Sequence, residues 1–184
     1  MTINIAIIII IVLVILILLT FLYKNILLSI IDKVYVKGNF DEALKRINKL
    51  YKFLPFNHQR LIVYKTSIYI LTDKDDLFLE EVNKIHRQSH TYGPYYYYYN
   101  IAYAINHNDF VKAEKLYGDL TTIFNVSKDF DLVTPLAILM ANKGDQKALK
   151  KLKELKRNNH IDITFLAVAN RYIRRTKRND LKED

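Results

Sequence analysis

The chain has 184 residues, of which 51% are hydrophobic and 26% charged, and its formal net charge is +9. This length fits about one domain. Only four glycines and three prolines are present, which excludes collagen-like and Gly/Ser linker sequences. The chain has no cysteine, which excludes disulfides, thiol catalysis and zinc or iron–sulfur sites built on cysteine.

The first 23 residues contain no charged side chain, and all 28 Lys+Arg and 19 Asp+Glu follow them. Within this segment, residues 5–23 are apolar except for Thr20. As a helix this run spans about 28 Å, close to the hydrocarbon core of a bilayer. No Lys or Arg precedes the run and no small-residue cleavage site follows it. We therefore expect residues 1–23 to be an uncleaved transmembrane anchor rather than a signal peptide.

The charges that flank this anchor predict its orientation. Lys24, Lys33, Lys37, Lys45 and Arg46 follow it, whereas its N-terminal side carries only the α-amine. The positive-inside rule then predicts a single-pass protein of the cell membrane, with its N-terminus outside and its C-terminal domain in the cytoplasm.

Beyond the anchor, apolar residues recur with a period of 35. Three columns at helical spacing describe one face of a helix that recurs four times. They are Ala43, Phe78, Ala113 and Ala148; Ile47, Val82, Tyr117 and Leu152; and Leu50, Ile85, Leu120 and Leu155. Columns in a preceding helix run from Ile31 to Leu136, from Val34 to Leu139 and from Tyr35 to Met140. Polar turns separate the two helices of each unit, so each unit is predicted to be a helical hairpin that must stack on its neighbours.

The segment Gly38-Asn39-Phe40-Asp41-Glu42-Ala43, followed by Ile47, Leu50 and Pro55, resembles the tetratricopeptide repeat consensus. His107 to Ala113 looks like a second copy. Phe78, where the family has Ala, and Pro135, inside a first helix, depart from the pattern. The resemblance implies an all-α fold in which about four such hairpins at residues 24–157 form a short α-solenoid. An amphipathic helix near 161–175 would cap its end, within a capping and basic segment at 158–184.

The resemblance also implies a concave groove lined by the first helix of each unit. Transferred by register, the groove positions are Leu28, Asp32, Tyr35, Val63, Ser67, Ile70, Tyr95, Tyr98, Ala102, Ile105, Asn106 and Met140. The five consecutive tyrosines 95–99 have two interpretations. They could anchor a bound peptide or protein partner, or they could simply pack inside a short solenoid.

No pattern for catalysis or for a cofactor is recognisable. His86 and His90 have the spacing of two ligands on a helix, but no HExxH motif accompanies them, so we expect no metal site. Asp73, Asp75 and Asp76 lack the following Gly and Glu of a calcium loop and indicate a turn and helix cap. The expected function is that of a non-enzymatic scaffold or adaptor.

The C-terminal stretch 143–184 carries 13 Lys+Arg and 6 Asp+Glu. A basic surface is predicted at Arg171, Arg174, Arg175, Lys177 and Arg178. It could be a solvated helix face, could contact a partner or anionic lipid, or, as the alternative function, could bind nucleic acid at the membrane.

Overall fold

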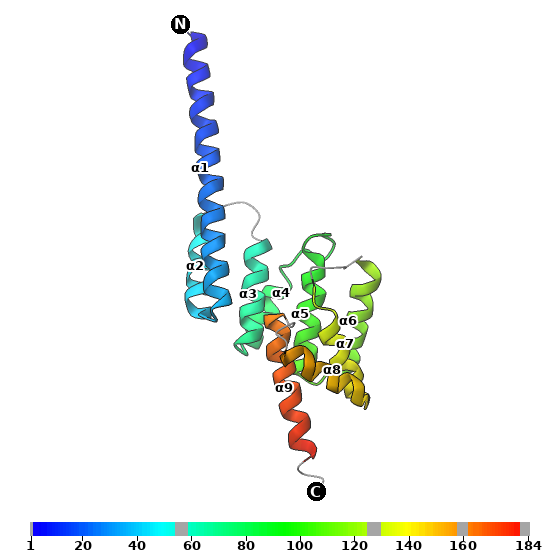
Figure 1. Cartoon of the computed structure of the whole chain (residues 1–184). Coiled ribbons are helices and arrows are strands. Elements are labelled where there is room, and N and C mark those ends of the chain that lie inside the picture. Colours follow the sequence, from blue (N-terminus) through cyan, green and yellow to red (C-terminus); the bar gives the residue numbers. More distant parts are fainter. Residues whose placement is uncertain (1, 54–58, 125–129, 158–161, 181–184) are drawn as a thin grey trace. The chain divides into compact units, whose positions relative to one another are not determined.

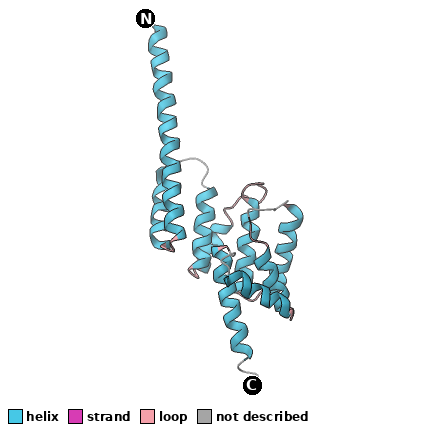
Figure 2. Ribbon diagram, in the orientation of Figure 1, coloured by secondary structure: helices cyan, strands magenta, loops and turns pink. Residues whose placement is uncertain are grey.

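The structure, a computed structural model, describes residues 2–53, 59–124, 130–157 and 162–180. These residues form nine helices and no strand, which confirms the all-α prediction (Figures 1 and 2). The helices are α1 (Thr2–Val36), α2 (Phe40–Phe53), α3 (Gln59–Leu71), α4 (Asp75–Val82), α5 (Gly93–Asn106), α6 (Phe110–Ile123), α7 (Val133–Asn142), α8 (Gln146–Arg157) and α9 (Ile163–Asp180). The chain divides into two compact units, residues 1–55 and 56–184.

In the first unit, the apolar segment and the first helix of the repeats form one continuous helix, α1. No Gly or Pro interrupts residues 2–36, so nothing in the backbone ends the helix at the change of composition after Tyr23. The stretch Ile7–Val36 is long and apolar enough to cross a membrane, and its apolar window is not buried by the protein. The last part of α1 packs on α2 through Leu28 and Ile31, both of which are buried.

Four helix pairs, α1–α2, α3–α4, α5–α6 and α7–α8, each form a hairpin closed by the same turn. One residue in each turn has a positive φ. The backbone amide of the residue that follows it donates a hydrogen bond to the carbonyl of the residue five positions before that amide. This is the Schellman arrangement, in which a left-handed residue ends a helix and satisfies a free carbonyl. The left-handed residues are Gly38 (75°), Asp73 (56°), Asn108 (60°) and Gly144 (91°). The bonds are Asn39 to Val34 (3.2 Å), Lys74 to Tyr69 (3.0 Å), Asp109 to Ala104 (2.9 Å) and Asp145 to Met140 (3.2 Å).

Side chains cap the second helix of three of these hairpins. Asn39, Asp109 and Asp145 accept hydrogen bonds from the amides of Glu42, Lys112 and Ala148, at 3.3, 3.1 and 3.1 Å. The equivalent residue before α4 is Lys74, which cannot accept such a bond and makes no cap. Its backbone (φ −96°, ψ 71°) nevertheless matches that of Asp109 (φ −86°, ψ 69°).

The predicted columns of the second helices correspond to their buried faces. Tyr117 and Leu155 are half-buried, and the remaining members are buried: Ala43, Ile47, Leu50, Phe78, Val82, Ile85, Ala113, Leu120, Ala148 and Leu152. Pro55, the family-like proline that closes the first unit, lies outside the described residues.

The predicted register is wrong for α7. Its turn residue, Gly144, comes 36 residues after Asn108 rather than 35. Leu136, which the 35-residue column aligns with the buried Ile31, Thr66 and Ile101, is 41% exposed, whereas Ala137 and Ile138 are buried. Met140, a predicted groove position, is 44% exposed.

Pro135 does not disturb α7, because it lies in the first turn, where its missing amide has no helical partner. Thr134 does not cap α7, although its hydroxyl precedes the proline. The carboxylate of Asp131 accepts a hydrogen bond from the Thr134 amide at 3.0 Å.

The uncapped start of α4 gives a test of the shared turn. We expect Lys74→Asn to stabilise the fold by about 0.5–2 kcal/mol, because the backbone is already in the conformation that lets Asp109 cap α6. Chemical denaturation of the full chain in detergent would measure the change. Lys74→Gln is the control, since it removes the charge at the helix N-terminus without supplying a cap. Equal stabilisation by both variants would assign the effect to charge alone.

The buried column of the second helices gives another test. We expect Ala113→Leu to cost about 1–3 kcal/mol, because Ala113 is fully buried and a larger side chain would overpack its surroundings. Val111→Leu on the same helix is the matched control, since Val111 is 84% exposed. If thermal melting is unmoved by Ala113→Leu, the hairpin contact at this position has been misassigned.

Candidate functional site

The inner face of the second unit is covered by its own last helix. α9 packs on α5, α7 and α3, which are the first helices of the three hairpins of this unit (Figure 1). Its apolar face is buried through Phe165, Val168, Ala169, Tyr172 and Ile173. The helix predicted to cap the end of the array therefore lies across the surface predicted to be a groove.

Specific contacts fix the first half of α9. The hydroxyls of Ser67 on α3 and Thr164 on α9 are hydrogen bonded at 2.9 Å, and both residues are buried. The ring of Phe165 packs edge-on against Tyr98 of α5, with 4.8 Å between the ring centroids. Because buried polar groups need partners, the hydroxyl pair specifies how α9 lies on α3 as well as contributing to its stability.

Two arginines one turn apart fix the second half of α9. Arg171 forms an ion pair with Asp73 (Nη1 to Oδ1, 2.8 Å) and also donates to the carbonyl of Leu71. Arg175 donates to Oδ1 of Asn108 at 2.9 Å. Asp73 and Asn108 are the left-handed residues of two successive turns. Two arginines that lie four residues apart on α9 thus bind equivalent residues of two successive hairpin turns.

This packing corrects the expectation of an open groove. In the second unit, Val63, Ser67, Ile70, Tyr98, Ala102 and Ile105 are buried, Tyr95 and Asn106 are half-buried, and only Met140 is exposed. In the first unit Leu28 is buried, while Asp32 and Tyr35 are half-buried. The predicted lining is mostly core in the folded chain.

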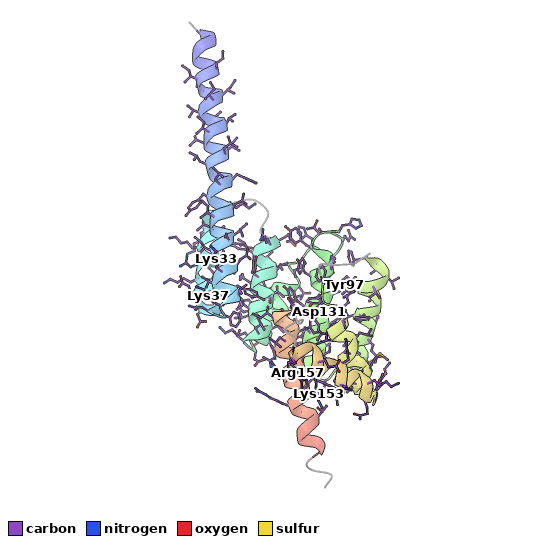
Figure 3. The ribbon with its side chains drawn as sticks, in the orientation of Figure 1. Lys33, Lys37, Tyr97, Asp131, Lys153 and Arg157 are labelled. Atoms are coloured by element: carbon purple, nitrogen blue, oxygen red, sulfur yellow. The ribbon has the colours of Figure 1, made fainter. Side chains whose placement is uncertain are left out.

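The five tyrosines follow the packing interpretation. Tyr98 and Tyr99 are buried and Tyr95 to Tyr97 are half-buried. Tyr95 and Tyr98 pack on Phe130, with centroid distances of 4.7 and 5.2 Å, and Figure 3 shows Tyr97 at the same end of the unit as Asp131. Burial, reinforced by the nearby carboxylates of Asp162 and Asp131, raises the pKa of the Tyr98 hydroxyl, which therefore stays protonated.

Some cations of the predicted basic surface are engaged in these internal contacts. Arg171 and Arg175 bind the turns, Arg174 is exposed, and the side chains of Lys177 and Arg178 lie outside the described residues. Exposed cations gather instead on α8, where Figure 3 labels Lys153 and Arg157. The α8 cations are Lys147, Lys150, Lys151, Lys153, Lys156 and Arg157, and Glu154 is the one acid of this helix.

An apolar surface remains open on the last hairpin. Val133, Leu136 and Met140 of α7 are exposed and line a shallow groove of about 290 Å³ between α7 and α8, which Lys147 and Lys151 flank. We call this surface the α7–α8 groove. Met140 is among the predicted groove positions and Leu136 is not. The sequence signal for this surface is that α7 belongs to the last hairpin, after which no further hairpin follows among the described residues.

Three of the five histidines lie in the part of the chain that the structure describes. His86 and His90 are exposed, and His107 pairs with Asp75 at 2.9 Å near the surface. Among the described residues, no three His, Cys, Asp or Glu side chains lie close enough together to hold a metal ion.

No family model, curated protein or solved structure matches the chain. Its function therefore has to be inferred from the surfaces of this chain alone.

The contact between α9 and the inner face can be tested at its centre. We expect Phe165→Ala to destabilise the second unit by about 3–5 kcal/mol, because the ring is fully buried against Tyr98. Denaturation of the full chain in detergent measures this loss. Arg174→Ala on the exposed side of α9 should change stability by less than about 0.5 kcal/mol. Equal effects of the two variants would contradict the placement of α9.

Proposed function

We propose that the chain is a non-catalytic scaffold of the cell membrane, anchored by α1 with its N-terminus outside and residues 24–184 in the cytoplasm. The length and apolar surface of α1 support the anchor. The cations that follow Tyr23, and their absence before it, support the orientation. The shared turn of the four hairpins supports a tetratricopeptide-like repeat, a class that binds proteins.

The observation that carries the binding function is the exposed α7–α8 groove. Helical arrays need a polar outer side on their last unit, yet Val133, Leu136 and Met140 leave this side of α7 apolar. Exposed apolar surfaces rimmed by polar residues mark protein contacts. Lys147 and Lys151 beside the groove favour a partner helix that has an apolar stripe and acidic flanks.

The inner face is a less suitable binding surface, because a partner would first have to displace α9. That step breaks the Arg171–Asp73 ion pair and exposes Phe165 and Tyr98. The α7–α8 groove needs no such rearrangement.

Site-specific photo-crosslinking in intact membranes tests this proposal. A photoreactive residue at Leu136 of the full chain should capture a partner protein, and Met140→Lys should reduce this capture at least tenfold without lowering the melting temperature, because Met140 is exposed. Val111→Lys is the control, since Val111 is exposed on α6. Capture that is insensitive to Met140→Lys contradicts the groove as the binding surface.

The orientation has its own test. A reporter that is active only in the cytoplasm should be active when fused after Asp184. A reporter that works only outside the cell can be fused at the same position. Its activity would overturn the proposed topology and, with it, a scaffold at the cytoplasmic face of the membrane.

The exposed cations of α8 favour one second candidate, which is binding of nucleic acid at the membrane. Salt separates the two candidates. Contacts of lysines with phosphates weaken steeply as salt rises, because binding releases condensed counterions, whereas an apolar contact at Leu136 and Met140 does not.

A further inference from the structure

A pocket of about 260 Å³ lies between α1 and α2 in the first unit. Its apolar wall consists of Tyr23 and Leu27 from α1 and Leu50 from α2. Lys45, Arg46 and Lys49 of α2 form its rim together with Glu42. All of these residues belong to one hairpin, so the pocket is complete within the first unit.

The position of this pocket along α1 is defined by the sequence of that helix. The apolar run of α1 ends at Tyr23, and Lys24 is its first charged residue. Tyrosines are enriched where a membrane helix leaves the hydrocarbon. Because α2 folds back along α1 after Gly38, the second half of α2 lies beside Tyr23 and Leu27. If α1 spans the bilayer as proposed above, the pocket lies at the level of the lipid headgroups.

The charges of α2 are segregated along its length. Asp41 and Glu42 lie in the first turn, next to the hairpin turn, and the cations follow from Lys45 onward. The acids are therefore nearer the hairpin turn and the cations extend toward Tyr23, although Glu42 also lines the pocket, where it is paired with Arg46. Figure 3 shows Lys33 and Lys37 toward the turn end of α1, away from the apolar run.

Two lysines of the rim carry positive charges that are available to a bound anion. Arg46 pairs with Glu42 at 2.7 Å, but Lys45 and Lys49 are exposed, and within the described residues no carboxylate forms an ion pair with either. The two lysines are one helical turn apart, so their ammonium groups can approach the same anion. A phosphate bound there would contact two ammonium groups and the edge of a guanidinium, which are the groups that bind phosphate in proteins.

We propose that this pocket binds the headgroup of an anionic phospholipid. Lys45, Lys49 and Arg46 hold the phosphate, and Tyr23 and Leu27 lie along the start of an acyl chain. The combination of an apolar wall with a cationic rim distinguishes a lipid from a free phosphate, which would have no use for the wall. This inference rests on the proposed insertion of α1 in a membrane.

The test uses the full chain in nanodiscs that contain equal amounts of phosphatidylglycerol and phosphatidylcholine, with retained lipids counted by native mass spectrometry. Wild type should retain phosphatidylglycerol in preference. The double variant Lys45→Gln, Lys49→Gln should lower this preference roughly 25-fold, because each cation near anionic lipid contributes about a fivefold preference. Lys153→Gln with Lys156→Gln on α8 is the matched control, since these lysines are exposed, about one turn apart and outside the α7–α8 groove. An unchanged preference in the α2 variant overturns the proposal.

Two further measurements distinguish a failure of the proposed membrane anchor from a failure of the proposed lipid pocket. Incorporation of the chain into the discs tests the anchor itself, because a chain that stays outside the discs refutes the proposed insertion rather than the pocket.

Wild type in discs of phosphatidylcholine alone is then titrated with inorganic phosphate. A rise in melting temperature equal to that produced by phosphatidylglycerol would assign the pocket to a soluble anion and overturn the lipid assignment. A lipid-free dimer that Lys45→Gln, Lys49→Gln abolishes would overturn it in favour of a second copy of the chain.

Discussion

The packing of α9 on α3, α5 and α7 is the interaction on which the surface of the second unit depends. It places Phe165, Val168 and Tyr172 in contact with the hairpins and so supplies much of the apolar core that three short hairpins could not form alone. The same packing commits Arg171 and Arg175 to the turns at Asp73 and Asn108. One helix therefore fills the inner face, removes two cations from the predicted basic surface and leaves the end of the last hairpin uncovered.

The turns determine how different sequences produce the same hairpin. Glycine adopts a positive φ without steric cost, and Asp and Asn tolerate it better than other residues. Gly38, Asp73, Asn108 and Gly144 thus close equivalent turns although the residues around them differ. No further hairpin follows α7 and α8 among the described residues. Leu136 and Met140 stay exposed there, although Ile101 and Ile105, 35 residues earlier in α5, are buried, so the α7–α8 groove belongs to the last hairpin of the array.

Much of the fold could be predicted from the sequence, because its determinants are local. The apolar run predicts α1, the polar turns predict the hairpin ends, and the 35-residue columns predict the buried sides of α2, α4, α6 and α8. The place of α9 could not be predicted in this way. An amphipathic helix with Phe165, Ala169 and Ile173 on one side suits the inner face and the array end equally well. The choice depends on contacts between residues about 100 positions apart, Ser67 with Thr164 and Arg171 with Leu71, which leave no periodic signal. The α1–α2 pocket was missed for a related reason, since it forms only when α2 folds back beside Tyr23.

The small size of the α7–α8 groove is consistent with a chain held at a membrane. Three exposed apolar side chains on α7 offer far less surface than the interfaces that hold soluble partners together tightly. Anchoring changes this requirement, because two proteins confined to the same surface meet at a much higher effective concentration than two proteins in solution. A weak contact at Leu136 and Met140 is then sufficient, and it remains readily reversible. In the proposed scheme, the anchor and the headgroup site of the first unit provide location, and the exposed groove of the second unit provides selectivity.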